Sequence, residues 1–445
     1  QLTTDIKTIK TLLEIPEVTK VEIPIRAVQN GIISAGVESI HADQIQKKGI
    51  LGNGIKIAVL DLGFDTTNPE IGQVAESKSF RYDFDKPVPL KGLGTEYVHG
   101  TAVSEIITDV APKSQLYLYT FSTEAEFLQA MDYAISKKVD MISMSAGWMN
   151  YPTDGTSPMT KKVQEAISKG IPFVVSSGNY AETHWEGKFV DADSNGWHEF
   201  SGNDEGMSFN VSQTRVSNKI PIIAYVMWSG PDLADLNLTL TDKDGKVVAS
   251  SSNAQKQKGD EFEYIYYVPS SAGIYNLGIT SNKKSDATIE VFAQNDRVEY
   301  PITKGSVSVP ADANGIISVG AVDIVNSNLE SFSSQGPTKN GKDSPSLVGP
   351  DAVKTHAYGN QLFYGTSAAQ PHVAGIVALM LEKISSLTPS QILSSLQDNA
   401  DKTVIPQSGD LNLFGHGKVD AHFIETVSVT KNEITSETID TKTDT

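Results

Sequence analysis

The feature that most constrains the fold is an alternation of short apolar runs with helix-like stretches between residues 55 and 179. Short continuous apolar runs are typical of buried parallel strands, and helices between them act as crossovers. The predicted strands are Ile55–Gly63, Gln115–Thr120, Asp140–Ser145 and Ile171–Asn179, and the predicted helices are Glu124–Lys137 and Ser157–Lys169. The sequence therefore predicts an α/β fold on a parallel sheet, with residues 64–98 irregular.

The predicted secondary structure changes after about residue 181, and the pattern predicts no helix from there to about residue 300. Short alternating segments separated by turns are typical of a β-sandwich, and the Asp242–Lys246 turn favours a hairpin. The seven predicted strands are Met207–Gln213, Pro221–Trp228, Leu236–Thr241, Val247–Ser251, Glu261–Val268, Tyr275–Thr280 and Thr288–Gln294. Because the pattern typical of an α/β fold resumes with Ile316–Val322, we expect an all-β domain inserted into the α/β fold.

Composition excludes several classes of protein. The 445 residues carry a net charge of −18, which argues against nucleic acid as a partner, because phosphate binding requires clustered Lys and Arg. The chain has no cysteine, which excludes disulfides and thiol catalysis. Its apolar runs are all shorter than the roughly 20 residues that span a bilayer, so we expect no membrane span.

Four polar residues stand where strands end or helices begin. Asp61 ends an apolar run, Asn179 ends another, His99 lies at a helix start, and Ser367 heads an apolar helix. Each has an ordinary structural role when taken alone: a turn residue, a surface histidine, or an N-cap, which Ser367 or Thr366 would provide. We also expect Pro371 in the first turn of that helix, where its missing N–H is harmless.

Together the same residues suit nucleophilic catalysis. A serine hydroxyl needs an adjacent base, which His99 can provide near neutral pH. Asp61 would accept a hydrogen bond from the other imidazole nitrogen and stabilise the imidazolium. Asn179 would donate its side-chain N–H to the oxyanion of the tetrahedral intermediate, beside the backbone N–H of Ser367.

Six motifs in order resemble the subtilisin-like serine proteases (subtilases). They are Asp61-Leu62-Gly63-Phe64-Asp65, His99-Gly100-Thr101, Ser143-Met144-Ser145-Ala146-Gly147, Ser177-Gly178-Asn179, Ser334-Gln335-Gly336-Pro337 and Gly365-Thr366-Ser367 through Gly375. The resemblance implies a parallel sheet with helices on both faces and a secreted or cell-surface serine endopeptidase made as a zymogen. It also implies that Ser145, Ala146 and Gly147 pair with a peptide substrate, and that Ser176, Ser177 and Gly178 form the opposite wall of the pocket.

The resemblance also suggests a division of the chain. Residues 1–30 would be the remnant of an inhibitory propeptide, acting as the enzyme's own inhibitor, and residues 31–180 and 306–427 the two parts of the catalytic domain. Residues 181–305 would be the inserted β-sandwich. Residues 428–445, rich in polar groups, would be a disordered tail or linker.

Two positions depart from the usual family pattern: Ala368 replaces a methionine, and Asp351 replaces a glycine near the nucleophile. The inserted region opens with Asp191, Asp193 and Asn195 ahead of Gly196, which matches the first half of a calcium loop. The alternative is a polar turn, because the bidentate Glu of a full loop is absent. Calcium is thus a candidate structural cofactor, and the chemistry itself requires none.

Two other functions are compatible with parts of the pattern. A binding or scaffold protein on a degenerate protease fold would have lost a catalytic residue, and none is lost here. The acid-acting serine-carboxyl peptidases also carry Gly-Thr-Ser, but use Glu and Asp in place of the histidine and Asp in place of the oxyanion Asn. His99 and Asn179 speak against that class.

Overall fold

The computed structural model describes residues 33–83, 86–230, 234–255, 261–294, 296–406 and 409–426. The predicted propeptide remnant at residues 1–30 and the predicted tail at residues 428–445 lie outside the described residues. In the described chain, no helix is long and apolar enough to cross a membrane.

A seven-stranded parallel sheet, in the order β17-β16-β7-β6-β1-β5-β2, organises the α/β region, which we call the catalytic part after the prediction made from the sequence. Its strands are β1 (Lys56–Asp61), β2 (Gln73–Ser79), β5 (Gln115–Thr120), β6 (Met141–Met144), β7 (Phe173–Ser176), β16 (Ile317–Asp323) and β17 (Leu347–Asp351). The order of strands reverses at β1, which pairs with β5 on one side and β6 on the other. Asp61 is the last residue of β1, at the switch point where such sheets place ligands.

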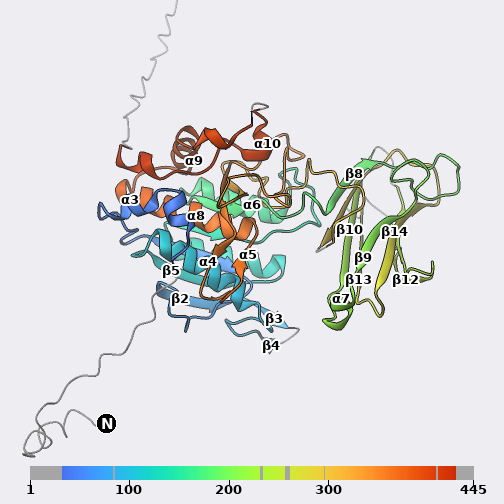
Figure 1. Cartoon of the computed structure of the whole chain (residues 1–445), viewed down its shortest axis with the longest axis horizontal. Coiled ribbons are helices and arrows are strands. Elements are labelled where there is room, and N and C mark those ends of the chain that lie inside the picture. Colours follow the sequence, from blue (N-terminus) through green and yellow to red (C-terminus); the bar gives the residue numbers. More distant parts are fainter. Residues whose placement is uncertain are drawn as a thin grey trace, which may run out of the picture. The chain divides into compact units, whose positions relative to one another are not determined.

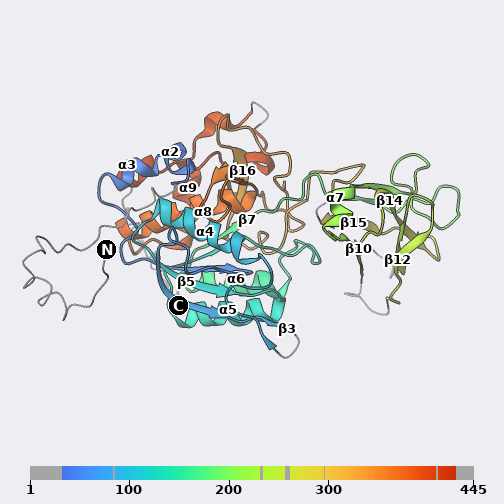
Figure 2. The same ribbon diagram turned by 60° about the horizontal axis from the view of Figure 1, so that its bottom comes forward.

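Helices cover both faces of this sheet, as predicted. Along β1, Ile57 and Val59 join the core that contains one set of helices, whereas Ala58 and Leu60 face the other set. The first set comprises α2 (Gly36–Ser39), α3 (Ala42–Gln46), α4 (Tyr97–Val110), α8 (Thr366–Lys383) and α9 (Pro389–Asp398). The second comprises α5 (Glu124–Ser136) and α6 (Pro158–Ser168), on the opposite side of the sheet (Figure 2).

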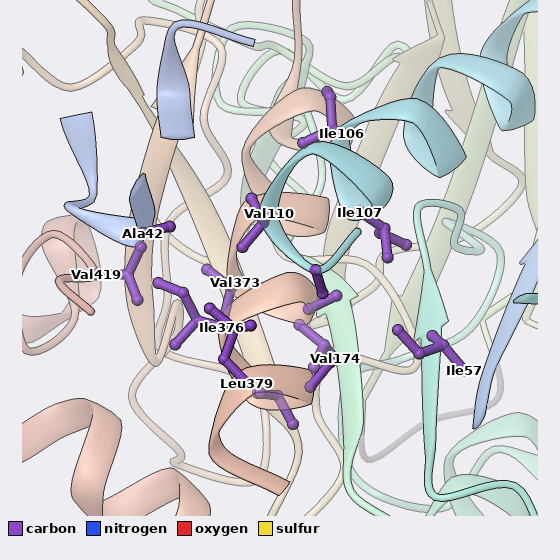
Figure 3. Packing of buried hydrophobic residues seen from close by; sticks show 14 of the residues in the cluster. Ala42, Ile57, Ile106, Ile107, Val110, Val174, Val373, Ile376, Leu379 and Val419 are labelled. Carbon is purple, nitrogen blue, oxygen red and sulfur yellow. The ribbon is translucent and has the colours of Figure 1, made fainter. Parts of the chain in front are cut away.

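Helix α8 packs closely against α4 because its contact residues are small. A Cβ at Gly375 would lie 2.4 Å from the Cβ of Val110, so no larger residue fits there. Figure 3 shows Val373, Ile376 and Leu379 of α8 among side chains of α4, β1 and β7. Since α4 carries His99 and α8 carries Ser367, this packing fixes the two helices that hold the candidate site.

Eight further strands form two antiparallel four-stranded sheets, in the orders β13-β10-β15-β8 and β12-β11-β14-β9 (Figure 1). We call residues 184–294 the β module. Its strands are β8 (His184–Lys188), β9 (Met207–Val211), β10 (Ile222–Ser229), β11 (Leu236–Thr241), β12 (Val247–Ser251), β13 (Phe262–Tyr267), β14 (Gly273–Ser281) and β15 (Thr288–Gln294). Residues from both sheets share one hydrophobic cluster, which is the packing of a sandwich. The domain boundaries drawn from the sequence stay a prediction.

Three details of the secondary structure correct the sequence analysis. Residues 64–98 are not all irregular, because they contain β2 at the edge of the parallel sheet and the short pair β3 (Tyr82–Asp83) and β4 (Lys86–Pro87). The β2 segment is polar and half exposed, so it lacks an apolar run. The β module contains a short helix, α7 (Gln213–Ser217), capped by Ser212, and a strand that was not predicted, β8, ahead of the seven that were.

The β module contacts the catalytic part through a small mixed interface. Met149 of the catalytic part packs with Met227 of β10 and Phe292 of β15, and Tyr180 meets Phe292 edge-on. Lys339 forms ion pairs with Glu186 of β8 and Glu290 of β15. Tyr180 follows Asn179 directly, so the β module joins the catalytic part beside the candidate site.

The remaining elements are short. They are β18 (Val353–Lys354), β19 (Leu362–Phe363), η1 (Lys402–Val404), α10 (Leu411–Phe414) and η2 (His422–Glu425). The β18–β19 hairpin leads the chain from the end of β17 into the first turn of α8.

Candidate active site

His99 and the buried Asp61 form a directed pair. Nδ1 of His99 lies 3.0 Å from Oδ1 and 2.9 Å from Oδ2 of Asp61, whose side chain is 1% exposed. The approach of α4 to the end of β1 depends on Gly100, since a Cβ there would lie 2.3 Å from the carbonyl oxygen of Gly63 and 2.9 Å from Cβ of Asp61. Gly100 thus makes room for the end of β1.

The surroundings of His99 favour its charged form. Burial lowers the pKa of His99, but the charge of Asp61 and the hydrogen bond to it together outweigh burial, so the pKa of His99 lies above its ordinary value. Phe363 meets the ring edge-on at 5.4 Å and is itself stacked on Tyr358. The side chain remains 31% exposed, and its Nε2 has no hydrogen-bond partner among the described residues.

The start of α8 corrects two predictions. Gly365, with φ of 119°, is the N-cap residue and the structure assigns no side-chain cap, so neither Thr366 nor Ser367 has the predicted capping role. Pro371 lies in the second turn, not the first. Because proline has no N–H, the carbonyl of Ser367 lacks its helical donor, and Oγ of Ser145 hydrogen-bonds to it at 3.4 Å instead.

Asn179 caps α8 from outside the helix. Its Oδ1 accepts hydrogen bonds from the backbone N of Thr366 at 2.8 Å and from Oγ1 of Thr366 at 2.9 Å. These bonds fix the amide, so that Nδ2 faces Gly365 with no hydrogen-bond partner among the described residues. The backbone N–H of Ser367, in the first turn of α8, is also without one in the described chain.

The two free donors converge on one point. A Cβ placed on Gly365 would lie 3.1 Å from Nδ2 of Asn179 and 3.6 Å from the backbone N of Ser367. Glycine leaves that space open to another molecule. Two N–H donors around one space at a helix N-terminus suit an oxyanion.

Ser367 lies beside this space and is 8% exposed. Its hydroxyl donates to the carbonyl oxygen of Ser145 at 3.3 Å, and no hydrogen bond joins it to His99 among the described residues. A long or absent bond between nucleophile and base is common without substrate, so this geometry does not exclude His99 as the base.

The segment Ser145–Gly147 continues β6 beyond its last paired residue. A Cβ on Gly147 would lie 2.6 Å from Oγ of Ser308, so the segment is pressed against residues 308–309. In the part of the chain that the structure describes, the backbone groups of Ala146 and Gly147 have no hydrogen-bond partner. They are therefore available to an extended peptide.

The segment Ser176–Gly178 begins at the last residue of β7. The backbone of Ser177 bonds to Val319 and Ser308, and Gly178, with φ of 114°, accepts from the backbone N of Ser334 at 2.9 Å. The buried Oγ of Ser177 has no hydrogen-bond partner in the described chain. The structure thus holds this segment firmly, while its role as a pocket wall stays a prediction.

Two buried residues support the site in roles that the sequence analysis did not predict. Gln370 is fully buried one turn after Thr366; its Oε1 accepts from Oγ of Ser145 at 2.8 Å and its Nε2 donates to Oγ of Ser143 at 2.9 Å. It therefore ties α8 to the end of β6. A long polar side chain next to small and apolar residues was the signal that could have revealed it.

Asp351 is the second. It is fully buried at the end of β17, and its Oδ1 accepts from the backbone N of Gly365 at 3.0 Å. Oδ2 has no hydrogen-bond partner among the described residues. Burial raises the pKa of Asp351 to about 7, and the nearby charge of Glu330 adds to the rise. The departure noted in the sequence thus holds the N-cap of α8.

The predicted calcium residues lie in a turn held mainly by its own hydrogen bonds, with a further bond from Nδ2 of Asn195 to Oε1 of Glu205 at 2.5 Å. Oδ1 and Oδ2 of Asp191 accept from the backbone N of Asn195 and Gly196, and Oδ1 of Asp193 also accepts from Asn195 N. Oδ1 of Asn195 accepts from the backbone N of Trp197 at 2.8 Å. A carboxylate oxygen has lone pairs to spare, so the turn does not prevent calcium binding, but its hydrogen bonds already explain these residue types.

The match to a family model covers most of the chain. The Subtilase family model matches residues 52–257 and 239–417, so the chain belongs to the subtilase family. The match includes Asp61, His99, Asn179 and Ser367 by position.

Relatives from Bacillus subtilis (strain 168) include the minor extracellular protease Vpr, 23% identical over 415 residues, covering 81% of this chain and 50% of Vpr. The major intracellular serine protease of the same strain is 31% identical over 159 residues, covering 32% of this chain and 49% of the relative. The chain therefore spans about half the length of these relatives. The CspB protease of Clostridium perfringens has the same fold, with a TM-score of 0.63 and 18% identity, covering 88% of this chain and 98% of that structure.

Proposed function

We propose that this subtilase is a serine endopeptidase with Ser367 as nucleophile, His99 as general base and Asp61 as the residue that orients it. The observation that carries the proposal is the pair of free donors on Asn179 and Ser367, which face one open space beside the serine hydroxyl. Family membership supports the same reaction.

The reaction follows from these positions. His99 takes the proton of Ser367 Oγ as that oxygen attacks the peptide carbonyl carbon, and the C–O bond forms. The carbonyl oxygen becomes an oxyanion that accepts from Nδ2 of Asn179 and from the backbone N of Ser367. His99 then gives its proton to the leaving amine as the C–N bond breaks, and water hydrolyses the acyl-enzyme by the same steps.

The substrate is a peptide bound in an extended form. The unpaired backbone of Ala146 and Gly147 would add it as a neighbouring strand, and Ser176, Ser177 and Gly178 would line the opposite side of its side chain. Backbone pairing gives affinity for many sequences, because it does not depend on the side chains of the substrate.

The proposal also covers the location of the enzyme, its inhibition before activation and its structural calcium. We infer an enzyme acting outside the cell or at its surface, kept inactive by an N-terminal propeptide and carrying structural calcium at Asp191, Asp193 and Asn195. The relative Vpr is named as extracellular, which supports this location, while another relative is named as intracellular. Detection of the protein in the culture medium or in the cell lysate decides between the two.

The test compares the full chain with Ser367→Ala on a peptide library between pH 4 and pH 10. We expect hydrolysis of internal peptide bonds, best above neutral pH, and a Ser367→Ala variant that folds but is inactive. A wild type that binds peptides without cutting them would instead support a scaffold. Retained turnover in Ser367→Ala would show that another residue is the nucleophile.

A further inference from the structure

The side chains of two histidines and one aspartate lie close together in the structure, and their positions in the sequence are far from Ser367. His41, the residue before α3, lies with Nδ1 3.1 Å from Oδ2 of Asp420, and His422, the first residue of η2, lies with Nδ1 3.1 Å from Oδ1 of the same side chain. One ligand atom from each of the three residues lies within 4.8 Å of the others. The two imidazole rings lie 3.9 Å apart.

These separations suit a single small ion. Zinc binds imidazole nitrogen and carboxylate oxygen at about 2.0–2.2 Å, which puts neighbouring ligands of a tetrahedron about 3.3–3.5 Å apart. Both nitrogen–oxygen separations are 3.1 Å, close to that spacing. The two rings are tilted by 30°, so they must turn for both Nδ1 atoms to face one ion. The side chains of His41, Asp420 and His422 are 39%, 20% and 48% exposed, which leaves a path from solvent.

Neighbouring groups orient the three side chains. Nε2 of His422 hydrogen-bonds to Oε1 of Gln44 at 2.9 Å, and Oδ1 of Asp420 accepts from the backbone N of His422 at 2.8 Å. If Nε2 of His422 donates to Gln44, its Nδ1 presents a lone pair toward the carboxylate. That arrangement requires a positive charge between them, either a proton or a metal ion.

A second cluster in the described chain differs from this one because a lysine already balances its charge. His184, Glu186 and Glu290 also lie close enough to hold a metal ion. There, however, Lys339 already pairs with both glutamates, at 2.5 Å and 3.4 Å. Among the described residues, the ion pairs of Asp420 are with the two histidines alone, so this cluster has no lysine or arginine to balance it.

We propose that His41, Asp420 and His422 bind one zinc ion, with the remaining coordination filled by water. Imidazole and carboxylate ligands favour zinc over calcium and magnesium, which prefer oxygen ligands alone. The proposal is independent of the peptidase activity and of the calcium proposed in the β module.

The site would fasten two distant parts of the chain. His41 lies near the first described residues and His422 near the last, and the backbone N of Ala421 already donates to the carbonyl of Ile40 at 2.8 Å. Lys48 and Glu425 form an ion pair across the same junction. A ligand that binds only the folded state stabilises it, so zinc should raise the melting temperature by holding this junction closed.

The experiment measures zinc binding to the full chain in the Ser367→Ala background, which prevents self-digestion. We expect titration calorimetry to give one zinc per chain, and zinc to raise the melting temperature. Any rise with calcium or magnesium at the same concentration should be the same in the Asp420→Asn variant as in its parent, because these ions do not use this site. Asp420→Asn and His422→Ala should each weaken zinc affinity by at least tenfold, and Gln44→Leu by about 10- to 100-fold, as for other groups that orient ligands.

Two controls keep the result interpretable. His416→Ala removes a histidine outside the cluster and should leave zinc affinity unchanged. Asp420→Asn keeps an oxygen that can accept from His422 N, so its fold should survive, which circular dichroism checks. The proposal fails if zinc does not bind stoichiometrically, or if it binds the Asp420→Asn and His422→Ala variants as tightly as their parent.

Discussion

Two groups of polar residues in this molecule look alike in the sequence and differ in the structure. At the candidate active site, three polar groups have no hydrogen-bond partner among the described residues. They are Nδ2 of Asn179, the backbone N of Ser367 and Nε2 of His99. In the turn that begins at Asp191, the side-chain oxygens accept hydrogen bonds from N–H groups of the same turn.

The difference separates a site from a turn. Folding satisfies nearly all buried polar groups, so groups that a protein holds in place yet leaves unpaired are available to a ligand. Asn179 shows both conditions in one side chain, because its Oδ1 is fixed by Thr366 while its Nδ2 is free.

The largest effect is expected from filling the space between the two donors. Gly365→Ala places a methyl group 3.1 Å from Nδ2 of Asn179 and forces a side chain into φ of 119°. We expect kcat/KM to fall by more than about 10²-fold, the loss typical of one donor, because both are obstructed. Gly359→Ala is the control, at a positive φ in open space, and should cost stability with little loss of activity. Equal losses of activity in both variants would show that backbone strain alone is responsible.

Removing one donor is the next test. Asn179→Leu keeps the approximate size of the side chain and loses Nδ2, so we expect kcat to fall by about 10²–10³-fold with little change in KM. Asn326→Leu changes an exposed asparagine and should leave kcat unchanged. A rise in KM at constant kcat would assign Asn179 to substrate binding in the ground state.

The pH profile tests the Asp61–His99 pair. Because the pKa of His99 is raised, the neutral base forms only above the ordinary histidine value of about 6.5, and kcat/KM should rise with pH through a midpoint above it. Asp61→Asn removes the negative charge, so the midpoint should move to lower pH while the maximum rate falls. A midpoint that stays in place would show that another group controls the profile.

A smaller effect concerns stability. Asp351 has its pKa raised to about 7 by burial, so the folded state holds its proton more tightly than the unfolded state, whose Asp pKa is about 3.9. Its contribution is therefore most favourable below pH 4 and declines as pH rises to 7. Asp351→Asn cannot ionise, so its stability relative to wild type should grow between pH 4 and 7 and then level off. Urea unfolding at several pH values measures this; a difference independent of pH would refute the raised pKa.

The smallest effect is expected at the turn in the β module. If calcium binds there, a concentration of ten times Kd stabilises the protein by about 1.4 kcal/mol, and Asp193→Asn should abolish that gain. Asp244→Asn, in the Asp242–Lys246 turn, is the matched control and should keep it. No calcium-dependent shift in the wild type would leave the turn with a structural role alone.

The sequence predicted the central strands of the parallel sheet well, because β1, β6 and β7 are short buried apolar runs. Asp61 could be placed at a strand end for that reason and lies there, whereas Asn179, predicted to end its strand, lies beyond the last residue of β7, which is Ser176. β2 was missed because an edge strand is half exposed and its side chains are mostly polar. α7 was missed because five residues are too few to show a helical period.

The supporting shell of the site was not predictable from the pattern. Gln370 and Asp351 act through contacts with Ser145 and Gly365, which are distant in sequence and meet only when α8 docks on the sheet. The capping of α8 was predicted from local preference for Thr or Ser, whereas the structure uses Asn179, 187 residues away. Local signals thus identify the chemistry, and the tertiary fold supplies the groups that hold it in place.

The central claim is that Ser367 attacks a carbonyl whose oxygen enters the space between Asn179 and the backbone N of Ser367. A crystal structure of the protein with a peptide aldehyde tests it most directly. The account predicts a covalent bond to Oγ of Ser367, with the aldehyde oxygen about 2.7–3.1 Å from both donors and the peptide paired with Ala146 and Gly147. An adduct on another residue, or an oxygen that points away from Asn179, would contradict it.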